Sequence, residues 1–509
     1  MNFLSPSRAL SPGSTLSPKA PSPGYKYCFK PYLLARLDQE EQGETRNSRS
    51  VWSAPYPGAF PTLHDSLAAR AVAIAAAAVV SLVAQAALAA DFEIRSADPY
   101  GMVSWANAFT AGVCTVETAV TPGGPWIPQQ NYFTTNEAGS APVPISGGIT
   151  FCRLLATDIS TNTPWHYTNL LYSYGRLETI AGKGQYNGDR TSYWLPSYEG
   201  GWATNANLSR PHIAFGDPHG NVLIVDQGSC SVLKVTPEGR IYTYAGTHVA
   251  GFNGDGPAPA TNLQMRLPNG GWMRSDGTLY VLDTENNKLR RIDTNQVMTT
   301  MFTTLSAMGD GRSLWVKSDE SVVYFGSGSA VGANVTTLNK WTPPNNFTVV
   351  RSDFQNMGNI MGDERTGALF ISDREAYRIY RLETNGALIT IAGNGTASGS
   401  GGEGFPALES SLNLPRSVWF LPNGGFFVGE HDPGNRIWFI DPAGILHRWM
   451  NGSSAKNVRV GDGQWFYANP SLAKVSRVRS VVTDPVGNLI IVESNYGFVR
   501  RIRFERLTP

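Results

Sequence analysis

The sequence is short of several features that identify common protein classes. Its 509 residues include only four cysteines and seven histidines, and 41 basic residues are balanced by 40 acidic ones. A net charge this close to zero is not typical of chains that bind nucleic acid through bulk electrostatics. Long amphipathic helical patterns, a G-x-S-x-G nucleophile elbow and a phosphate-binding loop are also missing. These gaps argue against a helical fold, a nucleic-acid partner and several large enzyme classes.

Glycine, proline and aromatic residues are plentiful, and they separate short apolar runs. The stretch 267–293, LPNGGWMRSDGTLYVLDTENNKLRRID, shows the arrangement most clearly. It reads as a strand, a tight turn at Ser275-Asp276-Gly277, a second strand, a polar turn and a third strand. This alternation of short strands and turns predicts an all-β fold.

The same unit recurs along the chain. Further copies lie at 210–235, 311–341, 358–382, 415–440 and 479–502. The copies at 311–341 and 358–382 are the least regular, and the last strand of the former is not recognisable. Because none of the six units can cover its own apolar faces, the repetition predicts that they stack on one another.

The second strands and the linkers carry a family resemblance. VLIVD, LYVLD, LFISD and LIIVE each end in an acid, and one linker reads YTYAGTHVAGFNGDGPAPATNLQMRLP. These segments resemble the NHL repeat family, whose members form six-bladed β-propellers. The resemblance covers the chain from about Gly175 to its end. RLETIA at 176–181 resembles a fourth strand but precedes the first unit, so we expect it to complete the last sheet and leave no open edge.

The first 90 residues do not fit this pattern. Residues 1–65 are rich in serine, proline and charge, which predicts a disordered extension or one that is absent from the mature protein. Residues 66–90 place Arg70 before AVAIAAAAVVSLVAQ and AALAA, as in a secretory signal peptide. An uncleaved membrane anchor is the alternative, since about 20 apolar residues just span a bilayer. The signal reading predicts a secreted or periplasmic protein, with no membrane span after cleavage.

Export makes the cysteines informative. Residues 91–172 contain Cys114 and Cys152 within strand-like runs, VCTVETAV and ITFCRLLATDI. We therefore expect a small β-sandwich-like domain held by a Cys114–Cys152 disulfide, ahead of a propeller at 173–509. Cys230 lies in a polar turn and is expected to be a free thiol. We expect a monomer.

The starts of the innermost strands supply candidate ligand-binding residues. In a propeller these positions lie at the mouth of the central channel, on the face where the linkers cross. They hold His212, Asn269, Arg312, Asn359, Arg416 and Arg479. Converging guanidinium groups would bind carboxylate, sulfate or phosphate, although arginines here would also serve to cap linker carbonyls. The linker tryptophans, which would stack on sugars if exposed, are Trp194, Trp202 and Trp465.

The acids that end the second strands recur too regularly to suggest catalysis. They are Asp226, Asp283, Asp373, Glu430 and Glu493, and we expect their carboxylates to accept backbone N–H groups in the next turn. Glu430 differs because His431 follows it, beside the unit that carries Arg416. We therefore name His212, Glu430 and His431 as candidate acid/base residues for an acidic substrate.

No metal or cofactor site is predicted. The peptidyl-amidoglycolate lyases are similar propellers that hold zinc through histidines at the inner strand starts, and only His212 matches that pattern. Calcium or zinc binding therefore has no support in the sequence, even if His248 and His431 were to approach His212.

These observations favour an exported propeller that binds an anionic or carbohydrate-like ligand at the channel mouth. Its partner would be an anionic small molecule, a polysaccharide or a protein. The alternative is a lyase or hydrolase at the same place, acting on a uronate polymer or a carboxylated peptide.

Overall fold

The structure is a computed structural model that describes residues 25–35 and 92–506, except 99, 144–148, 185–189, 305–306, 310–311, 331, 453–458, 467–472 and 495–496. The predicted signal peptide at 66–90 lies outside these residues. In the described part, strands predominate and the only α-helix is α2 (His166–Tyr172). The 3-10 turns are η2 (Pro196–Tyr198), η3 (Ala203–Asn205), η4 (Ala260–Asn262) and η5 (Thr284–Asn286). Within the same ranges, no helix has the length and apolar character needed to span a membrane.

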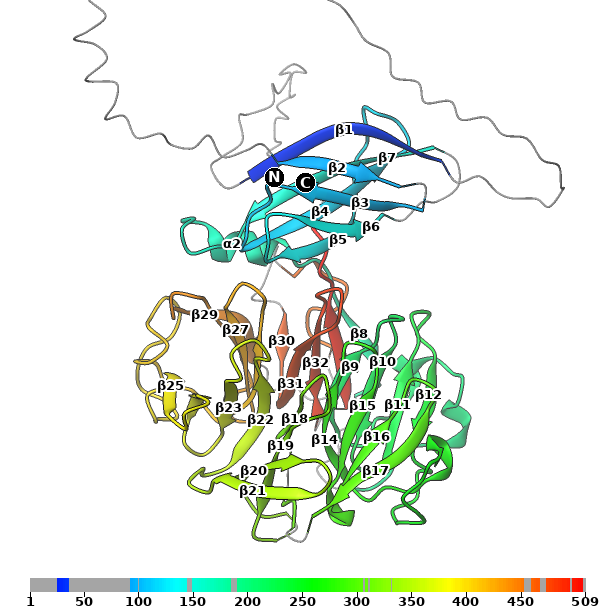
Figure 1. The fold of residues 1–509 in the computed structure, drawn as a ribbon, viewed down its shortest axis with the longest axis vertical. Coiled ribbons are helices and arrows are strands. Elements are labelled where there is room, and N and C mark those ends of the chain that lie inside the picture. Colours follow the sequence, from blue (N-terminus) through cyan, green and yellow to red (C-terminus); the bar gives the residue numbers. More distant parts are fainter. Residues whose placement is uncertain are drawn as a thin grey trace, which may run out of the picture.

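Two sheets form the N-terminal part of the molecule, drawn above the rest in Figure 1. One contains, in spatial order, β1 (Tyr25–Ala35), β7 (Ile149–Asp158), β4 (Gly112–Ala119) and β5 (Ile127–Thr134). The other contains β2 (Glu93–Ala97), β3 (Met102–Ala106) and β6 (Gly139–Pro142). Both contribute to one buried apolar cluster that includes Ile94, Trp105, Val116 and Leu154, so the two sheets pack against each other.

Residues 1–65, predicted to be a disordered extension or absent from the mature protein, include the strand β1. It pairs with β7 in antiparallel fashion, from Tyr25 opposite Thr157 to Ala35 opposite Ile149. The pairing is irregular between Cys28 and Tyr32, an interval that contains Pro31. A proline is tolerated at such a bulge because it has no N–H to donate to the ladder.

The predicted Cys114–Cys152 disulfide is wrong. Cys114 lies opposite Ala156 and Cys152 lies opposite Thr118 in the pairing of β4 with β7. A four-residue offset along a strand is about 13 Å, well beyond the roughly 7 Å that a disulfide tolerates between Cα atoms. Both are buried free thiols. Cys230 is also a free, buried thiol, as predicted.

Six further sheets, which we call ring sheets one to six, repeat one strand order with the first strand innermost. Ring sheet one contains β9 (Pro211–Gly216), β10 (Val222–Asp226), β11 (Ser231–Val235) and β12 (Ile241–Ala245). Ring sheet two contains β14 (Pro268–Met273), β15 (Leu279–Asp283), β16 (Lys288–Ile292), β17 (Val297–Thr303) and the short β13 (Ala258–Pro259). Ring sheet three contains β18 (Leu314–Val316), β19 (Val323–Gly328), β20 (Val335–Thr342) and β21 (Asn346–Arg351).

The other three ring sheets follow the same plan. Ring sheet four contains β22 (Met357–Gly362), β23 (Leu369–Asp373), β24 (Arg378–Leu382) and β25 (Leu388–Ala392). Ring sheet five contains β26 (Pro415–Phe420), β27 (Phe426–Glu430), β28 (Ile437–Ile440), β29 (Leu446–Gly452) and the short parallel β30 (Lys474–Val475). Ring sheet six contains β31 (Val478–Thr483), β32 (Leu489–Glu493), β33 (Phe498–Ile502) and β8 (Leu177–Ala181).

The innermost strands close into a ring. Each of β9, β14, β18, β22, β26 and β31 contacts the next, and β31 contacts β9. The arrangement is therefore a propeller-like β fold. The last sheet is completed from the N-terminal side, because β8 pairs with β33 through Leu177 opposite Ile502 and Ala181 opposite Val499. This confirms the pairing predicted for RLETIA.

The acids that end the second strands fix the linkers. In five ring sheets the carboxylate accepts a hydrogen bond from a backbone N–H seventeen residues upstream. The donors are the amides of Ser209, Arg266, Asn356, Asn413 and Ser476. Their structural role is as expected, but the partner common to all five is the preceding linker, and Asp373 also accepts from the N–H of Ala376 in the following turn over 3.4 Å. These bonds hold each linker at the start of its inner strand.

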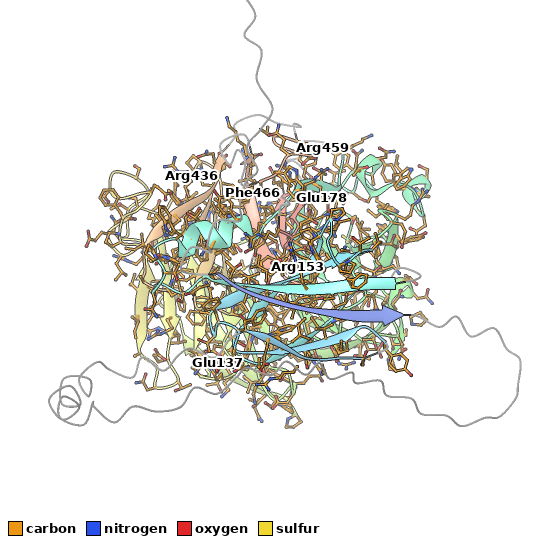
Figure 2. The ribbon with its side chains drawn as sticks, turned by 90° about the horizontal axis from the view of Figure 1, so that it is seen from above. Glu137, Arg153, Glu178, Arg436, Arg459 and Phe466 are labelled. Carbon is orange, nitrogen blue, oxygen red and sulfur yellow. The ribbon has the colours of Figure 1, made fainter. Side chains whose placement is uncertain are left out.

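The N-terminal sheets pack on the end of the ring where the inner strands finish. The amide of Gln130 donates to the carbonyl of Val486, in the turn after β31, over 3.1 Å. The backbone N–H of Asn131 donates to the carbonyl of Phe504 over 3.4 Å. Figure 2 looks onto these sheets with the ring behind them. Because the inner strands start at the other end, the linker side lies away from the N-terminal sheets.

Candidate functional site

A bulge at the start of the inner strands directs side chains out of the ladder. In β9, Pro211 lies opposite Asp226 and Ile213 opposite Val225, which leaves His212 without a ladder partner. The same irregularity follows the first residue of β14, β26 and β31. A bulged residue is re-aimed relative to its neighbours. The residues in this position are Asn269, Arg416 and Arg479.

Three of the predicted arginines carry positive charge close enough to two buried histidines to lower the pKa of both rings. The pKa of His212 lies well below its ordinary value, first because it is buried and then because Arg479, Arg312 and Arg416 add positive charge nearby. The pKa of His431 is also far below normal, through burial and then through the same three arginines. We call these five residues the arginine–histidine cluster. Burial and the nearby positive charge both favour the neutral form of the two imidazoles.

Two more arginines belong to this environment and were missed in the sequence. Arg210 contributes to the field at His212, and Arg374 contributes to the field at His431. Arg374 follows the strand-end acid of ring sheet four, which is the position that His431 holds in ring sheet five. Lining up the residue after each acid would have found it.

Both histidines have unusual surroundings. His212 is 1% exposed and His431 is 7% exposed. Within the described residues, neither nitrogen of either ring has a hydrogen-bond partner. Buried polar atoms are normally paired, because leaving one unpaired costs about 1–3 kcal/mol. Since a neutral imidazole offers one donor and one acceptor, the cluster presents hydrogen-bonding capacity that a ligand can use.

Asn359 does not belong to this cluster. Its place in the sequence repeat aligns it with His212, but in the pairing of the strands the equivalent residue is the one before it. The side-chain amide of Asn359 donates to the carbonyl of Val418 over 3.1 Å and accepts from the same residue's N–H over 2.7 Å. Ser417 does the same one sheet further on, where its hydroxyl accepts from the N–H of Val481 over 2.9 Å. Asn359 therefore links inner strands, and Gly358 holds the position equivalent to His212. Asn269 is correctly aligned and buried.

The Glu430 carboxylate holds the linker that precedes ring sheet five. It accepts from the backbone N–H of Asn413 over 2.7 Å and from the guanidinium of Arg436, labelled in Figure 2, over 2.8 Å. Burial raises its pKa although Arg436 opposes the shift. Alternation along the chain separates its side chain from that of His431.

The three linker tryptophans each pair with a different neighbour. Trp202 is half-exposed and lies under the Arg240 guanidinium, 3.9 Å from its ring centre. Trp465 lies under Arg176 at 4.9 Å. Trp194 stacks on His248 with ring centres 4.6 Å apart. Arg240 and Arg176 precede the outermost strands β12 and β8, so Trp202 and Trp465 lie at the periphery of the ring.

Aromatic side chains occupy the centre of the propeller-like fold, between opposite ring sheets. Trp272 of β14 and Trp419 of β26 come from opposite ring sheets, and their ring centres are 5.9 Å apart. These two rings lie three residues further along the inner strands than Asn269 and Arg416, which is about 10 Å. They therefore close off the channel beneath the arginine–histidine cluster, and we call them the aromatic floor. A cleft of about 710 Å³ lies at the far end, lined partly by Phe370, Trp419 and Phe420. Its charged residues form ordinary pairs such as Arg381 with Glu383, so the unusual electrostatics lie at the linker side.

Comparison with known proteins supports the fold. No family profile matches the chain, and no curated protein sequence matches it. A protein of unknown function from Bacteroides thetaiotaomicron is similar at 12% identity, with a TM-score of 0.50 over 81% of this chain and 98% of that one. An auxiliary nutrient binding protein from the same organism is 13% identical, with a TM-score of 0.47 over 82% and 98%. One from Bacteroides ovatus is 13% identical, with 0.48 over 79% and 93%. At these identities the likeness concerns the fold alone.

Proposed function

We propose that the chain is an exported six-bladed propeller of the NHL type, with a small N-terminal β-sandwich-like domain, that binds an anionic ligand at its linker side. One observation supports the proposal: Arg312, Arg416 and Arg479 all contribute positive charge at two buried histidines, His212 and His431, and with burial they lower the pKa of both rings. Guanidinium groups offer paired donors that match carboxylate, sulfate and phosphate. Export rests on the signal-like segment at 66–90.

The parts of the cluster have separable roles. The arginines supply charge in a buried setting, where electrostatic attraction is stronger than in water. His212 and His431 supply neutral donors and acceptors that orient the ligand. The aromatic floor limits how far a ligand can enter the channel. The cluster therefore accepts an acidic group at the end of a molecule. A uronic acid, a terminal sugar of an acidic polysaccharide or a carboxylated peptide meets this requirement.

A lyase or hydrolase acting at the same place is the second candidate. The observation in its favour is that burial and the arginines favour the neutral form of both histidines. A bound carboxylate would offset the arginine charge that opposes protonation, so either imidazole could then accept a proton from the substrate. An elimination would take the proton next to the carboxylate and release the group on the adjacent carbon. Incubation with polygalacturonate, followed by ultraviolet absorbance of the unsaturated product, separates this candidate from simple binding.

A thermal-shift experiment tests the proposal. A ligand that binds only the folded chain raises the melting temperature by mass action. Galacturonate, sulfate and phosphate are added to the parent, to an Arg416→Ala/Arg479→Ala variant and to an Arg365→Ala control. Arg365 is highly exposed, with only a 3.6 Å contact to Asp363. We expect at least one anion to stabilise the parent and the control but not the double variant. Equal shifts in all three proteins would contradict the proposal.

A further inference from the structure

A second group of ionisable side chains lies where the N-terminal sheets meet the ring. His166 is the first residue of α2, Asp441 follows β28, and His447 is the second residue of β29. The Nε2 atom of His166 is 2.9 Å from Oδ2 of Asp441, and Nε2 of His447 is 3.1 Å from the same oxygen. The three potential ligand atoms lie within 4.8 Å of one another. Two imidazoles and one carboxylate therefore meet at one point.

The outer contacts of each histidine determine which nitrogen is available. Nδ1 of His166 is 3.0 Å from the carbonyl oxygen of Thr163, and Nδ1 of His447 is 3.4 Å from a carboxylate oxygen of Glu403. Both oxygens only accept hydrogen bonds, so each Nδ1 carries the hydrogen. In a neutral imidazole the Nε2 lone pair is then free. Both Nε2 atoms face one carboxylate oxygen, and either a proton on each ring or a single metal ion satisfies all three atoms.

The ligand side chains are also held in orientation. The ring of His447 stacks on Tyr167, with centres 4.0 Å apart and an interplanar angle of 11°. The other oxygen of Asp441, Oδ1, accepts from the N–H of Ile445 over 2.9 Å. Zinc-binding histidines usually donate their second nitrogen to a carbonyl or a carboxylate, and zinc-binding carboxylates are themselves hydrogen-bonded. The surroundings of these three residues follow that pattern.

We propose that His166, Asp441 and His447 form a zinc site that fastens α2 to ring sheet five. Two imidazoles and a carboxylate suit zinc or a similar transition-metal ion, whereas calcium and magnesium prefer oxygen ligands alone. Neighbouring ligands of a tetrahedral zinc ion lie roughly 3.3 Å apart. The two N–O distances need to widen by a few tenths of an ångström, and the two nitrogens, which lie within 4.8 Å of each other, need to reach the same spacing. The fourth position is open to water or to a further ligand.

The site joins parts of the chain that are 275 residues apart. A metal that binds only the folded arrangement stabilises it by mass action. The ion would hold the N-terminal sheets against the ring, at the end opposite the arginine–histidine cluster. This inference does not depend on the proposed anion site.

Metal titration of the full chain tests the inference. After treatment with a chelator and dialysis, Zn²⁺ is titrated by calorimetry and Co²⁺ by visible absorbance. We expect one site per chain and a rise in melting temperature on adding Zn²⁺. Affinity should fall at least tenfold in His166→Gln and Asp441→Asn. The control His219→Gln, in an exposed hairpin turn, should bind as the parent does.

A second variant, at a residue that is not itself a proposed ligand, distinguishes loss of the zinc site from misfolding. Glu403 is half-exposed, and Glu403→Gln keeps the fold while weakening the outer contact to His447, so it should lower zinc affinity about 10- to 100-fold. Equal zinc affinity in the parent, His166→Gln and Glu403→Gln would overturn the inference. So would the absence of zinc binding to the parent, because the two histidine–aspartate contacts would then be ion pairs bridged by protons only.

Discussion

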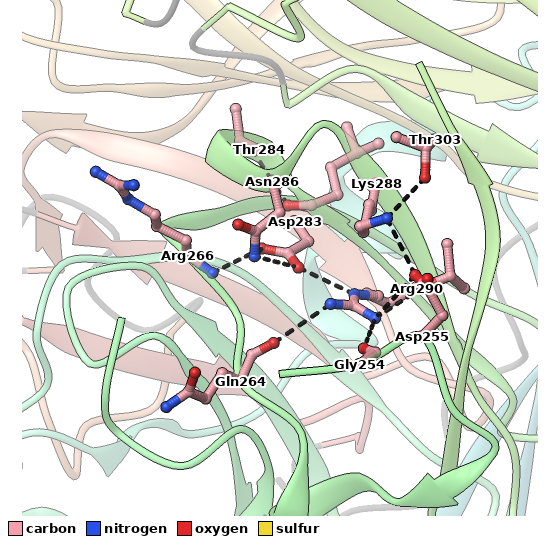
Figure 3. Close-up of polar contacts among 12 residues, drawn as sticks. Gly254, Asp255, Gln264, Arg266, Asp283, Thr284, Asn286, Lys288, Arg290 and Thr303 are labelled. Atoms are coloured by element: carbon pink, nitrogen blue, oxygen red, sulfur yellow. Dashed lines mark hydrogen bonds and ion pairs between the residues drawn. The ribbon is translucent and has the colours of Figure 1, made fainter. Parts of the chain in front are cut away.

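Nε of Arg290 donates to Oδ2 of Asp283 over 2.9 Å, and neither side chain has any exposed surface. Figure 3 shows that this pair also holds the preceding linker, because the same guanidinium donates to the carbonyls of Gly254 and Gln264. Arg500 repeats the arrangement in ring sheet six, where it donates to Val460 and Lys474 carbonyls. The pair therefore fixes linker and sheet together in each repeat that carries it.

Removing one partner of this pair should be costly. We expect Arg290→Ala to lower the free energy of unfolding by about 3–5 kcal/mol, because Asp283 is left as an uncompensated buried charge. The adjacent Arg291 pairs with the half-buried Glu320, so the control Arg291→Ala should lose only about 1 kcal/mol or less. Urea unfolding of the two variants measures the difference. Equal losses would show that burial of the first pair is energetically unimportant.

The thiols should be inert in the folded protein. Burial raises the pKa of Cys152 to about 12 and raises that of Cys114 as well, so neither forms the reactive thiolate. We expect an alkylating reagent to modify Cys114, Cys152 and Cys230 only after denaturation. Reducing agent should leave the melting temperature unchanged. A reductant-dependent loss of stability would indicate a disulfide after all.

Asp226 should make stability depend on pH. Burial raises its pKa from 3.8 to about 7, although hydrogen bonds from Ser209 and Ser229 oppose the shift. In this window the unfolded state binds fewer protons than the folded state, so stability falls as pH rises and levels off above about 7. Asp226→Asn should remove this slope, changing the difference between variant and parent by up to roughly 4 kcal/mol. Chemical unfolding at several pH values between 4 and 8 is the measurement, and identical slopes would refute the assignment.

His212 and His431 should remain neutral over the physiological range. Burial and then the neighbouring arginines lower the pKa of both rings far below normal. Histidine-ring NMR should therefore show no titration of either residue between about pH 5.5 and 8. Assignment by His212→Gln and His431→Gln identifies the signals. A midpoint near the ordinary pKa for either ring would mean that the arginines are not close to it.

The repeats and the closing strand could be predicted because each leaves a local pattern. VLIVD and LIIVE each combine an apolar strand with a terminal acid. RLETIA has the sequence of a fourth strand, although it precedes the first unit. The alignment of Asn359 was one residue out, and the pairing of β22 with β23 reveals the shift. The disulfide failed for a similar reason, since the β4–β7 register that separates Cys114 from Cys152 leaves no trace in residue spacing.

Other features depend on contacts between distant segments. His166 lies in a short helix, Asp441 in a hairpin turn and His447 in the strand after that turn, and nothing in their local sequence links the helix to the hairpin. Glu430 and His431 are adjacent in sequence, but their side chains point in different directions. Glu430 binds a linker amide, whereas His431 lies in the field of the arginines. Pro31 interrupts the alternating pattern of β1, so that strand was not recognised.

The most direct test of the account follows the two buried histidine rings by NMR during titration with galacturonate and, separately, with sulfate. If the arginine–histidine cluster is the anion site, the ring signals of His212 and His431 will shift in a saturable manner while that of His219 stays unchanged. The shifts will disappear in the Arg416→Ala/Arg479→Ala variant. Saturable anion binding that leaves both ring signals unmoved, or no binding of either anion, would contradict the account.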